Sequence, residues 1–274
     1  MRCPFILIHI GDEHFPDYVN KCIEQIYLWN KDADVFFLAN EVHRSKLTTN
    51  CNFISLETIP IGSKHALFKK HVASEFNTER LFVLEDFLEM KKLNECFHLE
   101  NDTLIYFDMY DVLPTLREEY KGLATPYLGK GEVSFSILYV RDAYFLTEMN
   151  QHILRINHIA HTETQAGCRY FLENPHVASF LPTISKECET DDEAFTTSRS
   201  SVFNGLWDSG AYGQYIDTKV VNKSCSFAAD QFVYTWASRN GGLWHPRVHR
   251  DEKSWPLYTL HIQSKNLSGI MCHL

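Results

Sequence analysis

The chain has 274 residues and a formal net charge of −9, with 45% hydrophobic and 22% charged residues. This composition is typical of a soluble globular protein and excludes wholesale disorder. The negative charge argues against sequence-independent nucleic-acid binding, which needs a basic surface. No stretch approaches the roughly 20 apolar residues of a membrane span, and we expect the short N-terminal apolar run to be a strand rather than a signal peptide.

Apolar patterning predicts alternating strands and helices along the chain. Continuous apolar runs are typical of buried parallel strands, whereas apolar residues at helical spacing predict helices. The predicted elements are strand 5–10, helix 14–29, strands 35–39 and 53–56, helices 63–77 and 78–93, strands 96–99 and 104–106, helix 113–120, strand 134–140, helices 141–158 and 162–173, and strands 243–245 and 257–262. This order predicts an α/β fold, with a mostly parallel central sheet flanked by helices and a ligand crevice at the strand carboxyl ends.

Two common nucleotide-binding motifs are missing from the sequence. Neither Gly-x-Gly-x-x-Gly nor Gly-x-x-x-x-Gly-Lys-Ser/Thr occurs, which argues against classical dinucleotide binding and P-loop chemistry. The polar stretch 183–202 is predicted to be a loop.

The eight cysteines are spread along the chain without a Cys-x-x-Cys pair. The even count is compatible with disulfides, but the spread favours reduced, mostly buried thiols. Asn101 begins an Asn-x-Thr sequon beside two acidic residues, where a glycan would block a binding site. We therefore expect a cytoplasmic location.

Two carboxylates, Glu100 and Asp102, follow the predicted strand 96–99. Residues two apart on an extended chain project the same way, so the two acids repel each other unless a cation lies between them. Mg²⁺ or Mn²⁺ suits such oxygen ligands and commonly binds substrate phosphates as well. An acidic chain that binds a diphosphate also needs positive charge from a cation. Taken alone, the pair equally fits a solvated turn.

The segment Leu99–Tyr106, with the sequence LENDTLIY, resembles the LDxDTLV segment of GT-A glycosyltransferases, especially those like glycogenin and galactinol synthase. The resemblance implies a single GT-A domain in which Glu100 and Asp102 ligate the metal bound to a nucleoside-diphosphate sugar. It also implies that Asn101 contacts this donor. Glu100 departs from the family pattern, which has Asp at this position.

Two further segments belong to the same resemblance. Asp108 and Asp111 resemble its D-x-x-E-L continuation and form a second candidate metal pair. Arg80, on the predicted helix 78–93, is expected to reach the nucleotide; alternatively it pairs with an acid of its own helix.

The segment that begins at His261 resembles the H-x-x-G-x-x-K closing motif of these enzymes. The resemblance implies that His261 is the third metal ligand and that Ser264 and Lys265 contact the donor diphosphate. Ser264 stands where the family has Gly, and Lys265 comes sooner than the family lysine. A lysine here would stabilise a leaving diphosphate. The alternative is a strand-terminal histidine with only local hydrogen bonds.

Residues 203–217 resemble the region where these enzymes recognise sugars. Asp208 is expected to accept a hydrogen bond from a sugar hydroxyl or to act as a general base, while Trp207 and Tyr212 stack on sugar faces. The alternative is a glycine-rich helix start with Asp208 as its cap.

The first predicted strand ends at His9 and Gly11. The same resemblance implies that this point contacts the nucleobase and ribose of the donor. The alternative is that both residues belong to the core or to a turn.

Together these features predict a metal-dependent glycosyltransferase, using Mn²⁺ or Mg²⁺, that moves a hexose or pentose from a nucleoside-diphosphate sugar to a hydroxyl of a glycan or glycoconjugate. A UDP-linked donor is favoured. Residues 1–274 are expected to form one domain, with a nucleotide-binding half at 1–125 and an acceptor and sugar half at 126–274. The alternatives are a non-catalytic sugar-binding relative and a sugar-phosphate nucleotidyltransferase, although the glycine-rich loop of the latter is missing.

Overall fold

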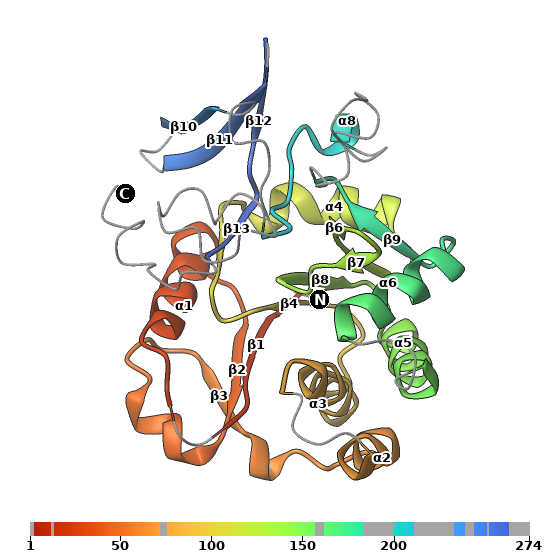
Figure 1. Cartoon of the computed structure of the whole chain (residues 1–274). Helices are drawn as coiled ribbons and strands as arrows, with labels where there is room; N and C mark the ends of the chain where they lie inside the picture. Colours follow the sequence, from red (N-terminus) through yellow and green to blue (C-terminus); the bar gives the residue numbers. More distant parts are fainter. Residues whose placement is uncertain are drawn as a thin grey trace.

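The central sheet is built from strands of both halves of the chain (Figure 1). The computed structural model describes residues 3–11, 14–71, 76–156, 162–183, 200–210, 233–238, 244–250 and 252–262. The strands of the central sheet are β1 (Phe5–His9), β2 (Val35–Ala39), β3 (Asn52–Ser55), β4 (Cys96–Leu99), β6 (Leu123–Gly129), β7 (Glu132–Val133), β8 (Ile137–Val140) and β9 (Ala178–Leu181). Their order is β3-β2-β1-β4-β8-β6-β7, with β9 paired to β6.

Most of these strands run in one direction. The pairs β1–β2, β1–β4, β2–β3 and β6–β9 are parallel, whereas β8 is antiparallel to both β4 and β6, and β7 is antiparallel to β6. The predicted α/β fold with a mostly parallel sheet is therefore confirmed.

Helices cover both faces of the sheet. They are α1 (Tyr18–Trp29), α2 (Ser63–His71), α3 (Phe76–Lys91), α4 (Met109–Glu119), α5 (Ala143–Ile156), α6 (Glu163–Glu173) and α8 (Ser200–Phe203), with short 3₁₀ helices η1 (Glu41–Lys46) and η2 (Leu56–Thr58). Alternate residues of β1 point into two separate cores. Phe5 and Leu7 pack with α1 and α4, whereas Ile6 and Ile8 pack with α2, α3, α5 and α6.

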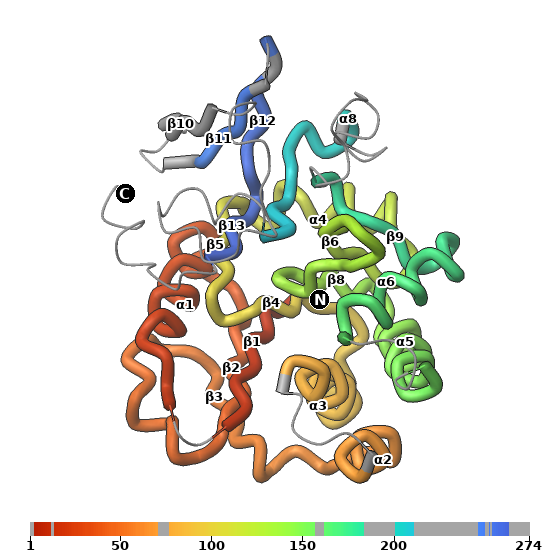
Figure 2. The backbone as a smooth tube through the Cα atoms, viewed as in Figure 1, coloured from red at the N-terminus to blue at the C-terminus, as the bar shows by residue number. Residues whose placement is uncertain are grey.

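Two small sheets complete the described structure. Strands β10 (Val233–Ser238), β11 (Trp244–Arg250) and β12 (Lys253–Pro256) form one, and β5 (Thr103–Ile105) with β13 (Thr259–His261) forms the other. In Figure 2 the late strand β13 returns to lie beside β5, directly after the turn that follows β4. This pairing brings β13 to the carboxyl end of the central strand β4.

The predicted elements occur in the predicted order, with shifted ends. The helix predicted at 113–120 is α4, which begins at Met109 because Asp108 caps it by accepting a hydrogen bond from the backbone N–H of Tyr110 at 2.8 Å. The strand predicted from residue 134 begins only at Ile137. The sequence analysis missed β6, which contains a proline, and also β7, β9, β10 and β12. The loop predicted at 183–202 lies largely outside the described residues. Among the described helices, none has the length and apolar composition needed to cross a bilayer.

Candidate metal centre and ligand cavity

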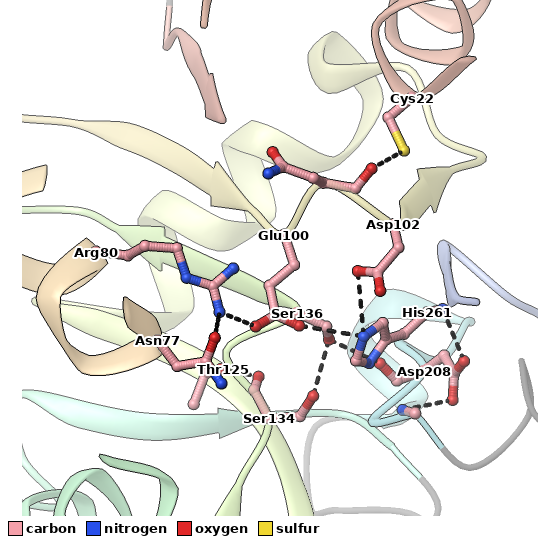
Figure 3. Close-up of polar contacts among 12 residues, drawn as sticks. Cys22, Asn77, Arg80, Glu100, Asp102, Thr125, Ser134, Ser136, Asp208 and His261 are labelled. Atoms are coloured by element: carbon pink, nitrogen blue, oxygen red, sulfur yellow. Dashed lines mark hydrogen bonds and ion pairs between the residues drawn. The ribbon is translucent and has the colours of Figure 1, made fainter. Parts of the chain in front are cut away.

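The turn after β4 holds two carboxylates in a fixed place. The backbone N–H of Glu100 donates to the carbonyl of Ser136 at 3.0 Å, and the N–H of Thr103 donates back to the carbonyl of Glu100 at 3.1 Å. One hydrogen bond therefore closes the turn itself, and the other connects it to Ser136, the residue before β8. Glu100 and Asp102 leave it close together, as the sequence predicted (Figure 3).

Strand β13 adds an imidazole to this pair. His261 stands opposite Thr103 in the antiparallel register of β13 and β5, and the N–H of Ile262 donates to the carbonyl of Asp102 at 2.9 Å. As a result, Nε2 of His261 lies 3.1 Å from Oε2 of Glu100 and 3.3 Å from Oδ1 of Asp102. One ligand atom of each residue lies within 4.8 Å of those of the other two.

The carboxylates of this cluster set the protonation of His261. Burial lowers the pKa of His261, but the carboxylates of Asp102, Glu100 and Asp208 outweigh burial and raise it to about 9. A proton on His261 therefore supplies the positive charge in the metal-free protein. A divalent ion bound by the same nitrogen and oxygens would replace that proton, because metal ligands must be deprotonated. Two carboxylates and one imidazole are a suitable ligand set for Mn²⁺.

Arg80 contacts the far oxygen of Glu100. Its Nη2 donates to Oε1 of Glu100 at 2.7 Å and to Oδ1 of Asn77 at 2.9 Å, and all three side chains come together beside the cluster (Figure 3). Asn77 belongs to the first turn of α3, and Arg80 follows directly after that turn. Arg80 thus pairs with Glu100 instead of the acids of its own helix that the sequence analysis considered.

Asp208 is fully buried, and both of its carboxylate oxygens accept backbone hydrogen bonds. Oδ2 accepts from the N–H of His261 at 2.9 Å, and Oδ1 accepts from the N–H of Gly210, also at 2.9 Å. The N–H of Asp208 in turn donates to Oγ1 of Thr259 at 2.9 Å. The sequence analysis expected Asp208 to accept a hydrogen bond from a sugar hydroxyl or to act as a general base. In this structure its carboxylate fixes the backbone that carries His261.

A cavity of about 480 Å³ opens beside the cluster. Its wall combines the carboxyl end of β1, the turn after β4, the first turns of α3 and α6, and the segment before β8. Polar residues on the wall are His9, Tyr18, Asn77, Arg80, Glu100, Asn101, Asp102, Ser134, Glu163, Thr164, Ser209 and His261. The predicted crevice at the strand carboxyl ends therefore exists, and the candidate metal ligands lie on its wall.

The end of β1 forms part of the cavity wall. Nε2 of His9 donates a hydrogen bond to the carbonyl of His14 at 2.8 Å, and the ring of His9 lies edge-on to that of His43 with centroids 5.1 Å apart. Burial lowers the pKa of His9, which favours a neutral ring. Gly11 has a positive φ of 117°, and a Cβ built on it would meet nothing within 4 Å. Asn101 donates from Nδ2 to the carbonyl of Ile8 at 3.0 Å, which ties the turn after β4 to β1.

Some expected site residues lie elsewhere. Trp207 is fully buried between the rings of Phe203 and Tyr258, with centroids 4.9 and 4.6 Å away. Its indole belongs to the core and is not available for stacking on a sugar in this structure. Asp108 caps α4, as described above, so its carboxylate serves the helix start. Tyr212, Ser264 and Lys265 lie outside the described residues.

The cavity also contains polar residues that the sequence analysis did not select. Glu163 and Thr164 come from the first turn of α6, and Ser134 and Ser209 face the cavity from two loops. Oγ of Ser134 donates to Oγ of Ser136 at 2.9 Å. A local sequence pattern marks the start of α6: the Thr-x-x-Gln pattern at 162–165. Here the side chain of Thr162 accepts a hydrogen bond from the backbone N–H of Gln165.

No protein-family model matches the sequence, and no curated protein matches it. Solved structures do match. Mouse xyloside xylosyltransferase 1 in its apo form has a TM-score of 0.47 and 10% identity, over 66% of this chain and 85% of that one. PaToxG glycosyltransferase has a TM-score of 0.46 and 10% identity, over 64% and 70%. The glycosyltransferase GlyE of Streptococcus pneumoniae TIGR4 has a TM-score of 0.45 and 15% identity, over 66% and 45%. All three of these proteins are glycosyltransferases.

Proposed function

We propose that this chain is a metal-dependent glycosyltransferase that moves a sugar from a nucleoside-diphosphate sugar, with UDP as the favoured nucleotide, to a hydroxyl of a glycan or glycoconjugate. The observation that carries the proposal is the convergence of Glu100, Asp102 and His261 within 4.8 Å on the wall of a cavity. Residues from β4 and from the far end of the chain meet there through the pairing of β5 with β13.

Asp102 and His261 would hold Mn²⁺ or Mg²⁺, with the Glu100 oxygen that faces His261 as the third ligand. When bound, such an ion stabilises the negative charge that develops on a leaving diphosphate. Arg80 adds a second positive group on the same side of the cavity, and its guanidinium N–H groups suit phosphate oxygens. The acidic chain would thus bind an acidic donor through one ion and one arginine.

The remaining wall residues supply contacts to the rest of the donor. His9 and Asn101, which line the cavity, would contact the nucleobase and ribose, and Gly11, two residues after His9, would allow the donor a close approach to the backbone. Glu163, Ser134 and Ser209 would exchange hydrogen bonds with sugar hydroxyls. In this proposal the half 1–125 supplies the metal carboxylates and nucleotide contacts, and the half 126–274 supplies the sugar contacts and His261.

Asp208 would act as a positioning residue in this site. Its carboxylate holds the backbone N–H of His261, so it fixes the direction in which the imidazole points. Ser264 and Lys265 remain proposed diphosphate contacts, and Tyr212 remains a proposed sugar contact.

Isothermal titration of UDP with and without Mn²⁺ tests the proposal. We expect Mn²⁺ to increase the affinity for UDP at least tenfold in the wild-type protein. Asp102→Ala should abolish this increase, whereas Asp111→Ala, which removes an acid of the second candidate pair, should preserve it. Equal UDP affinity with and without Mn²⁺ would contradict the metal site.

Two activity assays separate the proposed reaction from its alternatives. A glycosyltransferase should slowly hydrolyse a panel of nucleotide sugars in the absence of acceptor, and Asp102→Ala should stop that hydrolysis. A non-catalytic sugar-binding protein would bind these donors without hydrolysing them. Formation of a nucleotide sugar from UTP and a sugar 1-phosphate would instead identify a nucleotidyltransferase.

A further inference from the structure

The first turn of α3 carries Asn77, and Arg80 follows directly after it; both residues lie on the cavity wall. The first turn of any helix has free N–H groups and frays unless other contacts hold it. Here the turn is anchored from the side opposite to the cavity. Glu79 lies next to Arg80 in the chain and is almost completely buried, and its Oε1 accepts from Nε2 of His65 at 3.1 Å and from Nζ of Lys69 at 2.8 Å.

His65 is the centre of this anchor. It lies on α2, its side chain is only 6% exposed, and its two ring nitrogens face carboxylates from two different turns of α3. Nε2 contacts Glu79, while Nδ1 contacts Oδ2 of Asp86 at 2.7 Å. Asp86 also accepts the N–H of Gly62 at 3.1 Å, where a Cβ would come within 2.5 Å of the carboxylate. The loop before α2, the helix α2 and the helix α3 are therefore closely fitted around one imidazole.

The imidazole can hold both carboxylates only when it is protonated, because a neutral ring has one N–H and one bare nitrogen. Burial alone lowers the pKa of His65, but hydrogen bonds and charge from Asp86 and Glu79 outweigh it, and the pKa is raised above its usual 6.5. Two further ion pairs contribute charge at this interface: Lys69 pairs with Glu79, and Lys64 pairs with Glu85. Helix α5 contributes Thr147 and Asn150, both bonded to Glu85, and neither titrates.

We propose that His65 is a positioning residue for donor binding: by bridging Asp86 and Glu79 it fixes the first turn of α3, and so places Asn77 and Arg80 against Glu100 in the cavity. The inference rests on the proposed function only in that Arg80 contacts the donor. Breaking the bridge leaves the metal ligands in place and loosens the arginine. The expected effect is thus on the affinity for the nucleotide and not on the affinity for the metal alone.

Two substitutions of His65 each keep one of its two hydrogen bonds and remove the other. In His65→Asn the amide nitrogen takes the place of Nδ1 and keeps the bond to Asp86, whereas in His65→Gln it takes the place of Nε2 and keeps the bond to Glu79. We expect His65→Asn to raise the Kd of UDP, measured with saturating Mn²⁺ at pH 6.5, by about tenfold, the order of one lost hydrogen bond to a charged group. His65→Gln should raise it less than about threefold, because Glu79 keeps its partner.

Lys64→Gln is the matched control. Lys64 also ties α2 to α3, through Glu85 at 2.6 Å, but it does so away from the first turn. A general weakening of the contact between α2 and α3 would raise the Kd in all three variants in proportion to their loss of thermal stability. An unchanged Kd in His65→Asn, or an equal rise in Lys64→Gln, overturns the proposal.

Hydrogen exchange tests the anchor without any nucleotide. The amides of residues 80–83 donate to the carbonyls of the first turn of α3, residues 76–79, so they report its fraying. We expect these amides to exchange faster in His65→Asn than in Lys64→Gln. In the wild type, we expect the ratio of their exchange rates to those of residues 85–91 to increase as the pH rises above 6.5. Unchanged exchange overturns the positioning role. If the wild type binds no UDP with Mn²⁺, the proposed function fails, while the exchange result still decides whether His65 holds the turn.

Discussion

Asp208 holds His261 by its backbone: Oδ2 of the buried carboxylate accepts the N–H of His261 at 2.9 Å. The other oxygen accepts the N–H of Gly210, so the carboxylate joins two segments of the chain behind the candidate metal centre. A carboxylate can accept both bonds because it has no N–H of its own. The position of the imidazole relative to Glu100 and Asp102 therefore depends on a residue that does not line the cavity.

We predict that Asp208→Asn lowers both stability and Mn²⁺ affinity. The amide keeps one acceptor oxygen, but its NH₂ group faces a backbone N–H, which leaves a buried donor without a partner and costs about 1–3 kcal/mol. Urea unfolding measures the stability, and titration of Mn²⁺ measures the affinity. Ser209→Ala, at the next position, is the control and should leave Mn²⁺ affinity unchanged. A lower free energy of unfolding together with an unchanged affinity for Mn²⁺ would show that Asp208 does not position His261.

The pKa of His261 gives a prediction about protons. It is raised from 6.5 to about 9, mainly by Asp102 against the opposing effect of burial. Because the folded pKa is above the unfolded one, the stabilising ion pair of the metal-free protein is fully present below pH 6.5 and is lost as the pH rises through 9. At pH 7 a binding metal ion must displace that proton.

We therefore expect the wild type to release about one proton per Mn²⁺ bound at pH 7. Calorimetric titrations in buffers with different ionisation enthalpies count the released protons. His261→Gln should bind Mn²⁺ more weakly and release close to none. Wild-type binding without proton release would mean that the metal does not contact His261.

The sequence identifies the two central residues of the cluster, Asp102 and His261, because each lies next to a recognisable local pattern. Asp102 follows a short apolar strand, and His261 ends another. Their resemblance to a known motif predicts that they meet, and the pairing of β5 with β13 is the physical reason that they do. The strands around them were also predictable, since an apolar run reports burial directly.

Other features depend on tertiary packing that one sequence does not reveal. Trp207 was expected on a sugar, but a large aromatic ring is equally suited to a core, and the rings of Phe203 and Tyr258 enclose it. Glu163 was missed because nothing in its local pattern shows that the start of α6 faces the turn after β4. Arg80 had acids available on its own helix and pairs instead with Glu100, which only the packing of α3 makes possible.

Arg80 and Glu100 lead to a prediction with opposite effects on two ligands. The guanidinium neutralises one oxygen of Glu100 at 2.7 Å, so it competes for the carboxylate with any metal ion. Arg80→Gln should therefore leave the affinity for Mn²⁺ alone unchanged or raise it severalfold. The same change should weaken UDP binding in the presence of Mn²⁺ by about tenfold, because it removes a charge-assisted bond to phosphate.

Titration of Mn²⁺ and of UDP on the same variant separates the two effects. Arg80→Lys, which keeps the charge but loses the planar fork, should recover only part of the UDP affinity. Arg141→Gln, an arginine that faces Glu95 at 3.7 Å, is the control and should change neither affinity. A parallel loss of Mn²⁺ and UDP affinity in Arg80→Gln would mean that the arginine supports the metal ligands themselves.

Gly167 gives the last prediction, which connects helix packing to the shape of the cavity. It lies inside α6, where alanine is normally more stable than glycine by about 1 kcal/mol. A Cβ at this position would come 2.5 Å from Cζ of Phe135 and 3.2 Å from Cγ2 of Val133, and both of these residues line the cavity. Gly167→Ala should therefore destabilise the protein by about 1–3 kcal/mol in spite of its better helix propensity.

The same clash should weaken donor binding, because the displaced Phe135 ring moves within the cavity wall. Urea unfolding and UDP titration with Mn²⁺ should change together in Gly167→Ala. Adding Phe135→Leu removes the outer atoms of the ring, so the double variant should regain much of the lost stability through this direct contact. A Gly167→Ala protein that is more stable than the wild type would show that the side chains of Phe135 and Val133 can move aside without cost. It would also show that α6 does not determine the shape of the cavity.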